Sequence, residues 1–361
     1  MNHHPHTTSA IALAFGLVLG LGSATWACAQ SAAPGNVTLY GAIDLSVTRT
    51  SNANAADQAV IGVTSGAYLP SIWGIKGEED LGGGLRAFFK LENSFTADTG
   101  AVTTNASFFN RFSLVGLRTP WGSVTAGRLG SMQFDHTAIG YDLTMLDTYG
   151  IVALGALPPS LFKINNAVKF ESLAWQGWRA SLMTSTGTEV AESASSGRYS
   201  GGAVEYAQPG LKVRFTHEQT HGTYSATPAA NQASRVDERS SLALRWDEGP
   251  WQVFADVVAV QGDLRITPRG RVLQGGVGYR FAPEWNLIAE VGRYHYADSD
   301  GRPTLAHVVV QHDLSKRSML YGFWTQVDNH GGSLVGTSFG GSVSRAGQGQ
   351  SAVGAGLMHR F

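Results

Sequence analysis

Apolar residues recur at every second position along much of this chain. Val37, Leu39, Gly41, Ile43, Leu45 and Val47 alternate with Thr38, Tyr40, Ala42, Asp44, Ser46 and Thr48. The pattern returns over residues 85–92, 211–216 and 242–247. A period of two indicates β-strands with one apolar face and one polar face. A soluble β-sandwich alternates in the same way, so this pattern alone does not decide between a soluble sheet and a membrane barrel.

The connections between these patterns alternate between short and long. Seven short links rich in turn-forming residues are found at 79–85, 119–123, 174–178, 206–211, 247–251, 281–286 and 313–318. Eight longer polar stretches lie around 49–70, 96–109, 129–164, 185–200, 218–240, 260–272, 297–304 and 328–350. Seven turns and eight loops make fifteen connections and therefore sixteen strands. Short turns on one side and long loops on the other are typical of outer-membrane barrels. The sequence thus predicts an all-β, sixteen-stranded antiparallel transmembrane β-barrel.

The tryptophans and the charge content agree with a membrane barrel. Trp121, Trp175, Trp178, Trp246, Trp251 and Trp285 all lie in or beside the short turns, where an interfacial aromatic girdle belongs. Charged residues make up 15% of the chain, against roughly 25% in ordinary soluble domains. The net charge of -1 gives no electrostatic reason to bind nucleic acid.

Residues 1–29 are predicted to be a secretory signal peptide. An apolar stretch over residues 10–22 is too short to span a bilayer, and Ala27-Cys28-Ala29 supplies a small-x-small cleavage site. Cleavage would leave residues 30–361 as one barrel domain. A lipoprotein reading of Cys28 is disfavoured by the bulky Trp26 close before it. Because Cys28 is the only cysteine, a disulfide framework and a cysteine-ligated zinc site are excluded.

Four segments carry a family resemblance in the right order along the chain. They are residues 36–44 (NVTLYGAID), 73–85 (WGIKGEEDLGGGL), 313–317 (DLSKR) followed by 320–322 (LYG), and 359–361 (HRF). These segments resemble the general porins of Gram-negative bacteria, in particular the branch typical of β-proteobacteria. The resemblance implies a multi-pass outer-membrane channel for passive diffusion of small hydrophilic solutes and ions.

The resemblance also implies partners and an assembly route. Porins of this kind are homotrimers that contact outer-membrane lipid and lipopolysaccharide, and their third outer loop folds into the lumen. The family-type terminal aromatic, here Phe361, would be recognised by the outer-membrane barrel assembly machinery. No cofactor is implied.

Candidate pore residues follow by position from the resemblance. Arg111 and Lys163 match basic wall residues, and Arg128 closes a Gly-Arg step that family members share, although its alternation with Val124 is awkward without a bulge. A further basic position before Trp73 is Ile72 here, which argues against strong anion selectivity.

The third loop, residues 129–164, supplies candidate acidic residues. It contains Asp135, Asp142 and Asp147. Carboxylates on an inner loop that face basic wall residues would set up a transverse field at the constriction.

Motifs for other chemistry are weak. Residues 336–340 (GTSFG) fit the G-x-S-x-G pattern, but no acidic residue follows Ser338 to complete a triad. His217 and His221 have a helical metal spacing on a predicted strand, and residues 298–301 match only part of a calcium loop. We therefore expect neither an enzyme nor a metal site. The alternatives that stay open are a solute-specific channel and, in a different class, an outer-membrane barrel enzyme or adhesin.

Overall fold

Antiparallel strands make up most of the chain in the computed structural model, which describes residues 36–361 except 105–106, 145–146, 192–193, 195 and 223–231. The predicted signal peptide, residues 1–29, lies outside the described residues. The strands are β1 (Asn36–Thr50), β2 (Val60–Ser65), β3 (Ile72–Gly82), β4 (Leu85–Thr96), β5 (Ala101–Val102), β6 (Phe112–Thr119), β7 (Gly122–Gly130), β8 (Lys163–Ser172), β9 (Trp178–Ser185), β10 (Arg198–Gln208), β11 (Leu211–His221), β12 (Val236–Glu248), β13 (Trp251–Gly262), β14 (Gly270–Ala282), β15 (Trp285–Tyr296), β16 (Thr304–Asp313), β17 (Ser318–Asp328) and β18 (Gln350–Arg360).

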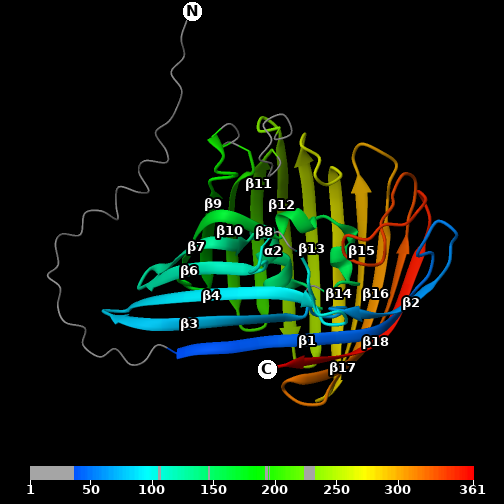
Figure 1. Cartoon of the computed structure of the whole chain (residues 1–361), viewed down its shortest axis with the longest axis horizontal. Helices are drawn as coiled ribbons and strands as arrows, with labels where there is room; N and C mark the ends of the chain where they lie inside the picture. The colour runs from blue at the N-terminus through cyan, green and yellow to red at the C-terminus, as the bar shows by residue number, and fades with distance from the viewer. Residues whose placement is uncertain (1–35, 105–106, 145–146, 192–193, 195, 223–231) are drawn as a thin grey trace, which may run out of the picture.

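These strands form one sheet that closes on itself (Figure 1). Strand β1 pairs with β18 on one side and with β2 and β3 on the other. Strands β2 and β3 together occupy one position in the wall, because β3 pairs with residues 36–42 of β1 and β2 pairs with residues 45–50. Strand β5 is a two-residue strand beside β4. Eighteen strands therefore fill sixteen wall positions, and the predicted sixteen-stranded barrel is confirmed.

The predicted connections fall where the strands end. Each of the seven short turns joins two consecutive strands, for example at residues 83–84 between β3 and β4. The eight longer connections lie at the other ends of the strands. Several expected loops were too long: β11 extends to His221 and β12 starts at Val236, so the ladder takes in both ends of the loop expected over residues 218–240, and β2 lies within the loop expected over residues 49–70.

The outer face of the barrel is apolar. On β15, Trp285, Leu287 and Val291 are exposed, whereas the intervening Asn286 and Glu290 are buried on the inner side. Alternation of this kind places one set of side chains toward lipid and the other toward the lumen.

One stretch of the inner wall is apolar as well. On β13, Val257 faces outward, yet Phe254, Val258 and Val260 on the inner face are also apolar and are buried. Loop 3, residues 131–162 between β7 and β8, packs on this stretch. Leu143, Ile151 and Leu154 of loop 3 share a buried cluster with Phe254 and Val258. The second apolar face of β13 is therefore explained by the loop that covers it.

Loop 3 is a chain of short helical segments within the ring of strands (Figure 1). They are α2 (Met132–His136), η1 (Thr137–Tyr141), η2 (Ile151–Leu154) and η3 (Pro159–Leu161). Ser131 caps α2, because its hydroxyl accepts a hydrogen bond from the backbone N–H of Phe134. No helix among the described residues has the length and apolar character needed to cross a membrane.

The seam between β1 and β18 depends on a glycine. The backbone N–H of Phe361 donates to the carbonyl oxygen of Gly41 at 3.0 Å, and that of Gly41 donates to the carbonyl of Phe361 at 3.1 Å. A Cβ atom at Gly41 would lie 2.4 Å from Cζ of the Phe361 ring and 2.6 Å from the carbonyl oxygen of Ile72. No side chain fits at position 41 unless the seam moves.

We predict that Gly41→Val destabilises the closed barrel, by roughly 1–3 kcal/mol or more, because the added atoms force the seam apart. Thermal unfolding followed by heat-modifiable gel mobility measures the effect. Gly62→Val on β2 is the matched control, since a Cβ there meets nothing within 4 Å. Equal melting temperatures for the two variants would contradict this account of the seam.

Candidate pore constriction

Loop 3 is fastened to the inner wall by Arg239 of β12. Its Nε atom donates to the carbonyl oxygen of Ala156 in loop 3 at 2.7 Å, and one terminal nitrogen donates to Asp237 at 2.7 Å and to Thr267 at 2.6 Å. The Arg239 side chain is 1% exposed. An arginine this deeply buried is stable only with anionic and hydrogen-bonding partners, and here those partners join wall and loop.

A second attachment joins α2 to β10 and β11. One carboxylate oxygen of Glu218 accepts hydrogen bonds from the backbone N–H of Gln133 and the hydroxyl of Tyr199, both at 2.8 Å. The Tyr199 hydroxyl in turn accepts from the backbone N–H of Met132 at 2.7 Å. Two N–H groups at the start of α2, which the helix itself leaves unsatisfied, are thus satisfied by the barrel wall.

Two of the three predicted acidic residues of loop 3 hold the loop in shape. One Asp142 oxygen accepts from both the backbone N–H and the hydroxyl of Thr144, each at 2.8 Å. Asp147 accepts from the backbone N–H of Tyr149 at 2.8 Å and lies 3.2 Å from Nε2 of His307 on β16. Both carboxylates are buried. Their contacts are with the loop and the wall behind it, and neither residue lines the lumen cavity described below.

The third acidic residue, Asp135, does reach the lumen. It lies on α2 and accepts a hydrogen bond from Nζ of Lys169 on β8 at 2.5 Å. Lys169 also lies 3.0 Å from Glu171. The basic wall residue that this acidic loop residue contacts is therefore Lys169 and not Arg111 or Lys163.

Arg111 and Lys163 lie together on the wall formed by β4, β6 and β8. Nε of Arg111 donates to Glu92 at 2.7 Å, and Glu92 also binds Lys90 at 2.9 Å and the hydroxyl of Tyr40 at 2.8 Å. Glu92 thereby offsets part of the positive charge at this point.

Lys163 makes a different set of contacts. Its Nζ atom lies over the rings of Phe112 (4.0 Å) and Phe134 (3.1 Å) and has no hydrogen-bond partner among the described residues. The two ring faces are its nearest electrostatic partners. The ammonium group is enclosed by the wall and loop 3.

Neither Arg128 nor Ile72 lines the lumen cavity described below. Nε of Arg128 donates to the carbonyl oxygen of Asn110 at 2.9 Å, and its guanidinium also binds the side chain of Asn165. The β6–β7 ladder runs without a shift through this position, so Arg128 is on the same face of β7 as Val124. The register shift that does occur here is between β7 and β8. Ile72 opens β3 opposite Ser94.

A cavity of about 490 Å³ lies in the lumen between loop 3 and the wall from β4 to β11. Its polar lining includes five basic and three acidic residues: Arg118, Lys169, Arg179, Lys212 and Arg214 against Asp135, Glu171 and Glu205. Arg214 lies 3.6 Å from Glu205. Tyr141 of loop 3 donates to Glu205 at 3.1 Å, and burial together with the Glu205 charge raises the pKa of Tyr141, which keeps the phenol protonated.

Arg179 and Lys212 are the two basic side chains of this cavity with no ion-pair or hydrogen-bond partner among the described residues. Lys212 lies across from loop 3, where a Cβ at Gly140 would be 3.5 Å from its Nζ atom. The sequence analysis missed both residues as pore residues. The signal for Lys212 was present, because Lys212 and Arg214 alternate with the apolar residues of β11. The barrel thus encloses a charged, water-accessible passage beside loop 3.

Comparison with known proteins identifies the family. Residues 8–332 match a family model described as Gram-negative porin. The chain belongs to the Gram-negative porin family. Outer membrane porin protein 32 of Delftia acidovorans is 28% identical over 358 residues, which cover 91% of this chain and 95% of that protein. Major outer membrane protein P.IB of Neisseria lactamica is 25% identical over 337 residues, which cover 87% of this chain and 95% of that protein.

Solved structures share the fold. The structure titled anion-selective porin from Comamonas acidovorans has a TM-score of 0.77 and 23% identity, and covers 91% of this chain and 100% of that one. OmpT of Vibrio cholerae in a trimer form has a TM-score of 0.65 and 14% identity. The match covers 91% of this chain and 99% of that one. The family and these relatives are channels. The protein is an outer-membrane porin that forms a water-filled channel for passive diffusion of small hydrophilic solutes and ions.

The short turns of such a porin face the periplasm, and a second basic region lies there. A cavity of about 270 Å³ is lined by Arg245, Arg280, Lys316, Arg317 and Arg360, with Asp313 as its one acidic residue. Arg280 lies 3.4 Å from Asp313, and Arg245 pairs with Asp247 at 3.0 Å. The side chains of Lys316, Arg317 and Arg360 have no partner among the described residues. This part of the periplasmic mouth of the porin is therefore basic.

The residues of the three weaker motifs lie in a loop, in a contact between neighbouring strands and in an ion pair. Residues 336–340 lie in the long loop before β18, and Nδ1 of His217 lies 2.9 Å from the Ser240 hydroxyl. Asp298 pairs with Arg269. Among the described residues, no group of three or more His, Cys, Asp or Glu side chains is placed to hold a metal ion.

We predict that Arg239→Leu lowers the stability of the porin by about 3–5 kcal/mol, because Glu218 and Asp237 lose their buried cation. Arg86→Gln is the control. Arg86 also forms an ion pair, with Glu78 at 3.0 Å, but its side chain is 55% exposed, so about 0–1 kcal/mol is expected. Unfolding midpoints in urea measure both effects. A loss of stability in Arg239→Leu no larger than in Arg86→Gln would show that Arg239 does not fasten loop 3.

Proposed function

We propose that this porin passes small anions more readily than small cations. The supporting observation is the charge of the two lumen cavities, whose linings together hold ten basic and four acidic residues. Arg179, Lys212, Lys316, Arg317 and Arg360 carry no compensating partner among the described residues. Low-dielectric walls focus the field of such charges into the water-filled path, which raises the local concentration of anions.

Three features keep the proposed preference moderate. Glu92 compensates charge beside Arg111, and Ile72 replaces a basic residue that the family resemblance leads us to expect. Asp135 and Glu171 both bind Lys169, and two carboxylates against one ammonium group leave a net negative charge at that point of the wall. The basic periplasmic mouth then contributes more of the field than the constriction does.

We expect Arg111→Ala and Lys212→Gln each to shift the ion preference of the channel toward cations. One unit charge about 8 Å from a permeating ion in water contributes about 0.5 kcal/mol, or roughly a twofold change in relative permeability. Reversal potentials in a planar bilayer under a salt gradient measure the shift. The control is Arg49→Gln, because Arg49 is exposed on the face of β1 that also carries Val47. Reversal potentials equal to that of the unmodified porin in both pore variants would refute the assigned roles.

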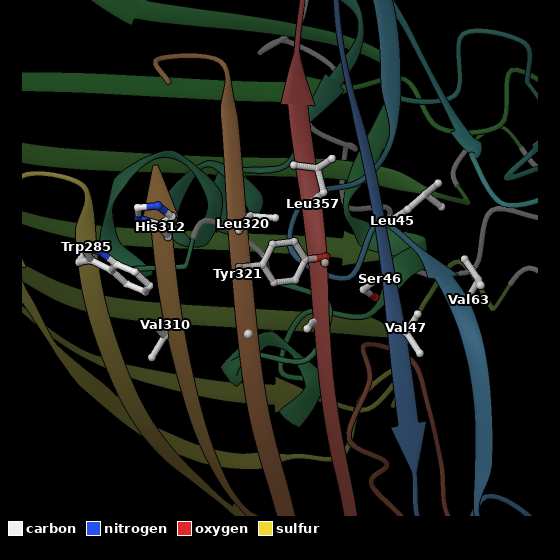
Figure 2. Close-up of a pocket in the computed structure, with 13 residues that line it drawn as sticks. Leu45, Ser46, Val47, Val63, Trp285, Val310, His312, Leu320, Tyr321 and Leu357 are labelled. Atoms are coloured by element: carbon white, nitrogen blue, oxygen red, sulfur yellow. The ribbon is translucent and has the colours of Figure 1, made fainter. Parts of the chain in front are cut away.

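A homotrimer is the assembly we propose. A shallow groove of about 620 Å³ lies where the barrel closes (Figure 2) and is lined by half-buried Leu45 and by exposed Val47, Val63, Leu320 and Leu357. It is hollow because Gly322 of β17 and Ala355 of β18 lie opposite each other and fill little space. Close packing against a second copy suits an apolar surface with small residues at its centre.

We predict that Ala355→Trp, which fills this groove, dissociates the trimer, whereas Ala255→Trp on the exposed face of β13 does not. Light scattering of the detergent-solubilised protein, corrected for bound detergent, reports the oligomeric state. An unmodified protein that is monomeric, or a trimeric Ala355→Trp variant, would count against this interface.

We also propose how the porin is exported and assembled. Residues 1–29 act as a cleaved signal peptide, and residues 30–361 form the mature porin. Phe361, which is half-exposed beside Gly41 at the seam, is recognised by the outer-membrane barrel assembly machinery.

A further inference from the structure

Two histidines are enclosed between loop 3 and the barrel wall. His136 of α2 and His307 of β16 are fully buried, and Nε2 of each ring faces a buried carboxylate. His136 lies 3.1 Å from Asp256 on β13, and His307 lies 3.2 Å from Asp147 in loop 3. Two histidine–aspartate pairs therefore join loop 3 to the wall at separate points.

Both ring nitrogens of His307 face hydrogen-bond acceptors. On the Nδ1 side, the hydroxyl of Thr325 on β17 lies 2.7 Å away and donates its hydrogen to the carbonyl oxygen of Tyr149 at 2.9 Å. Because a hydroxyl has only one hydrogen, the Thr325 oxygen must accept from Nδ1. On the Nε2 side, the Asp147 carboxylate also accepts. All of these hydrogen bonds form together only when His307 carries a hydrogen on each nitrogen, which makes the ring an imidazolium.

His136 has a different set of partners. The hydroxyl oxygen of Thr216 on β11 accepts a hydrogen bond from Nε of Arg214 at 3.2 Å, which leaves the hydroxyl hydrogen for Nδ1 of His136, 3.2 Å away. A neutral ring with its hydrogen on Nε2 therefore satisfies Thr216 and Asp256 together. The hydrogen bonds require a positive charge on His307 but none on His136.

The side chains around His307 are acidic. Glu290 on β15 lies directly opposite His307 in the ladder and is 4% exposed. The carboxylate of Asp142 lies beside that of Glu290. The charge of Asp147 also acts on Glu290 and on the buried Asp44 of β1. Four buried carboxyl groups thus surround this part of loop 3, and a positive charge on His307 lowers the repulsion among them.

The other titratable and charged groups nearby do not replace His307. Arg245 is paired with Asp247 at 3.0 Å, and the charge of Arg360 acts on Tyr68. Three phenols, which carry no positive charge, lie within the field of Asp147: Tyr68, Tyr149 and Tyr321. Among the described residues, the one ion pair of Asp147 is with His307. A buried carboxylate needs such a partner, so the charge balance and the hydrogen bonds agree on an imidazolium.

Loss of one proton from His307 would break this arrangement. A neutral ring either turns an Nε2 lone pair toward the Asp147 carboxylate or leaves the Tyr149 carbonyl without its donor, because Thr325 must then donate to the ring. Either result leaves a buried polar group unpaired, which is costly. Histidine is the side chain that most readily changes its charge near neutral pH. The attachment of loop 3 at this point therefore depends on pH.

We propose that His307 is an imidazolium at neutral pH and that its charge fastens residues 147–149 of loop 3 to β16 and β17. The attachment is present at neutral pH and is lost as the pH rises and His307 gives up its second proton. Loop 3 lies between this half of the wall and the charged passage, so a loop that leaves the wall moves into the passage. The channel then closes more often at alkaline pH. The proposal is independent of ion selectivity and of trimer formation.

Nitrogen NMR of the two buried rings tests the assigned charges. The full-length porin is labelled with ¹⁵N-histidine and reconstituted in lipid, and the ring signals are assigned through the backbone of the native protein. At neutral pH we expect His307 to show two protonated nitrogens with similar chemical shifts. His136 should show one protonated and one unprotonated nitrogen, whose shifts lie far apart. Titration toward alkaline pH should convert His307 to the second pattern.

Single-channel recordings in planar bilayers at neutral and alkaline pH measure the fastening itself. In the native porin we expect the closed fraction of the recording time to rise about tenfold or more at alkaline pH, because Asp147 loses the partner of a buried ion pair. Asp147→Asn should abolish this rise, since the amide can donate to Nε2 of a neutral His307. His217→Gln is the matched control and should keep the rise, because His217 contacts the Ser240 hydroxyl at 2.9 Å and has no ion pair among the described residues.

Three results would overturn the proposal. One is a neutral His307 ring at neutral pH, and the second is a closed fraction that stays constant while this ring loses its proton. The third is an alkaline rise in Asp147→Asn equal to that of the native porin, which would assign the effect to another group. The first two measurements use the native porin alone, so they decide even if Asp147→Asn does not fold. Reversal potentials enter none of these readouts, so a failure of the proposed anion preference is distinguishable from a failure of this attachment.

Discussion

Backbone hydrogen bonds set the first condition for this molecule, since a sheet inside a bilayer has no water to satisfy a free edge. Strand β1 meets that condition by pairing with β18 on one side and with β2 and β3 on the other. Gly41 makes the seam possible, because the ring of Phe361 occupies the space that a side chain would need. With the ring of strands closed, the interior becomes a separate compartment in which a loop can be fixed.

That interior is divided into two unlike halves. The wall from β12 to β17 carries buried apolar residues such as Phe254, Val258 and Leu305, and loop 3 covers them. The wall from β4 to β11 carries Arg118, Arg179 and Lys212 beside the water-accessible cavity. The lumen cavity beside loop 3 therefore lies against the charged half. On the first side the buried Arg239 holds loop 3 to the wall, whereas on the second side Arg179 and Lys212 have no partner among the described residues and are the side chains to which we attribute part of the proposed attraction of anions.

The fold was more predictable from sequence than the pore was. A period of two and the alternation of short and long connections are local patterns, and they gave the sixteen strands. The pore charges depend on which distant residue faces each side chain. Asp142 and Asp147 were expected to face basic residues of the pore wall. Their carboxylates instead contact Thr144 and His307. Arg239, which fastens loop 3, looks like any other inward arginine on an alternating strand. The run Val257-Val258-Ala259-Val260 was a usable signal, because an inner face this apolar needs a cover.

The way loop 3 is fastened has a consequence for how the porin matures. Its attachments reach Tyr199 on β10, Arg239 on β12, His307 on β16 and Thr325 on β17. These side chains come from distant parts of the sequence and converge only when the strands between them are in register. Contacts of such long range form late in folding, because chain entropy opposes them until the intervening structure exists. We therefore expect loop 3 to settle against the wall only after the strands from β8 to β17 are in register.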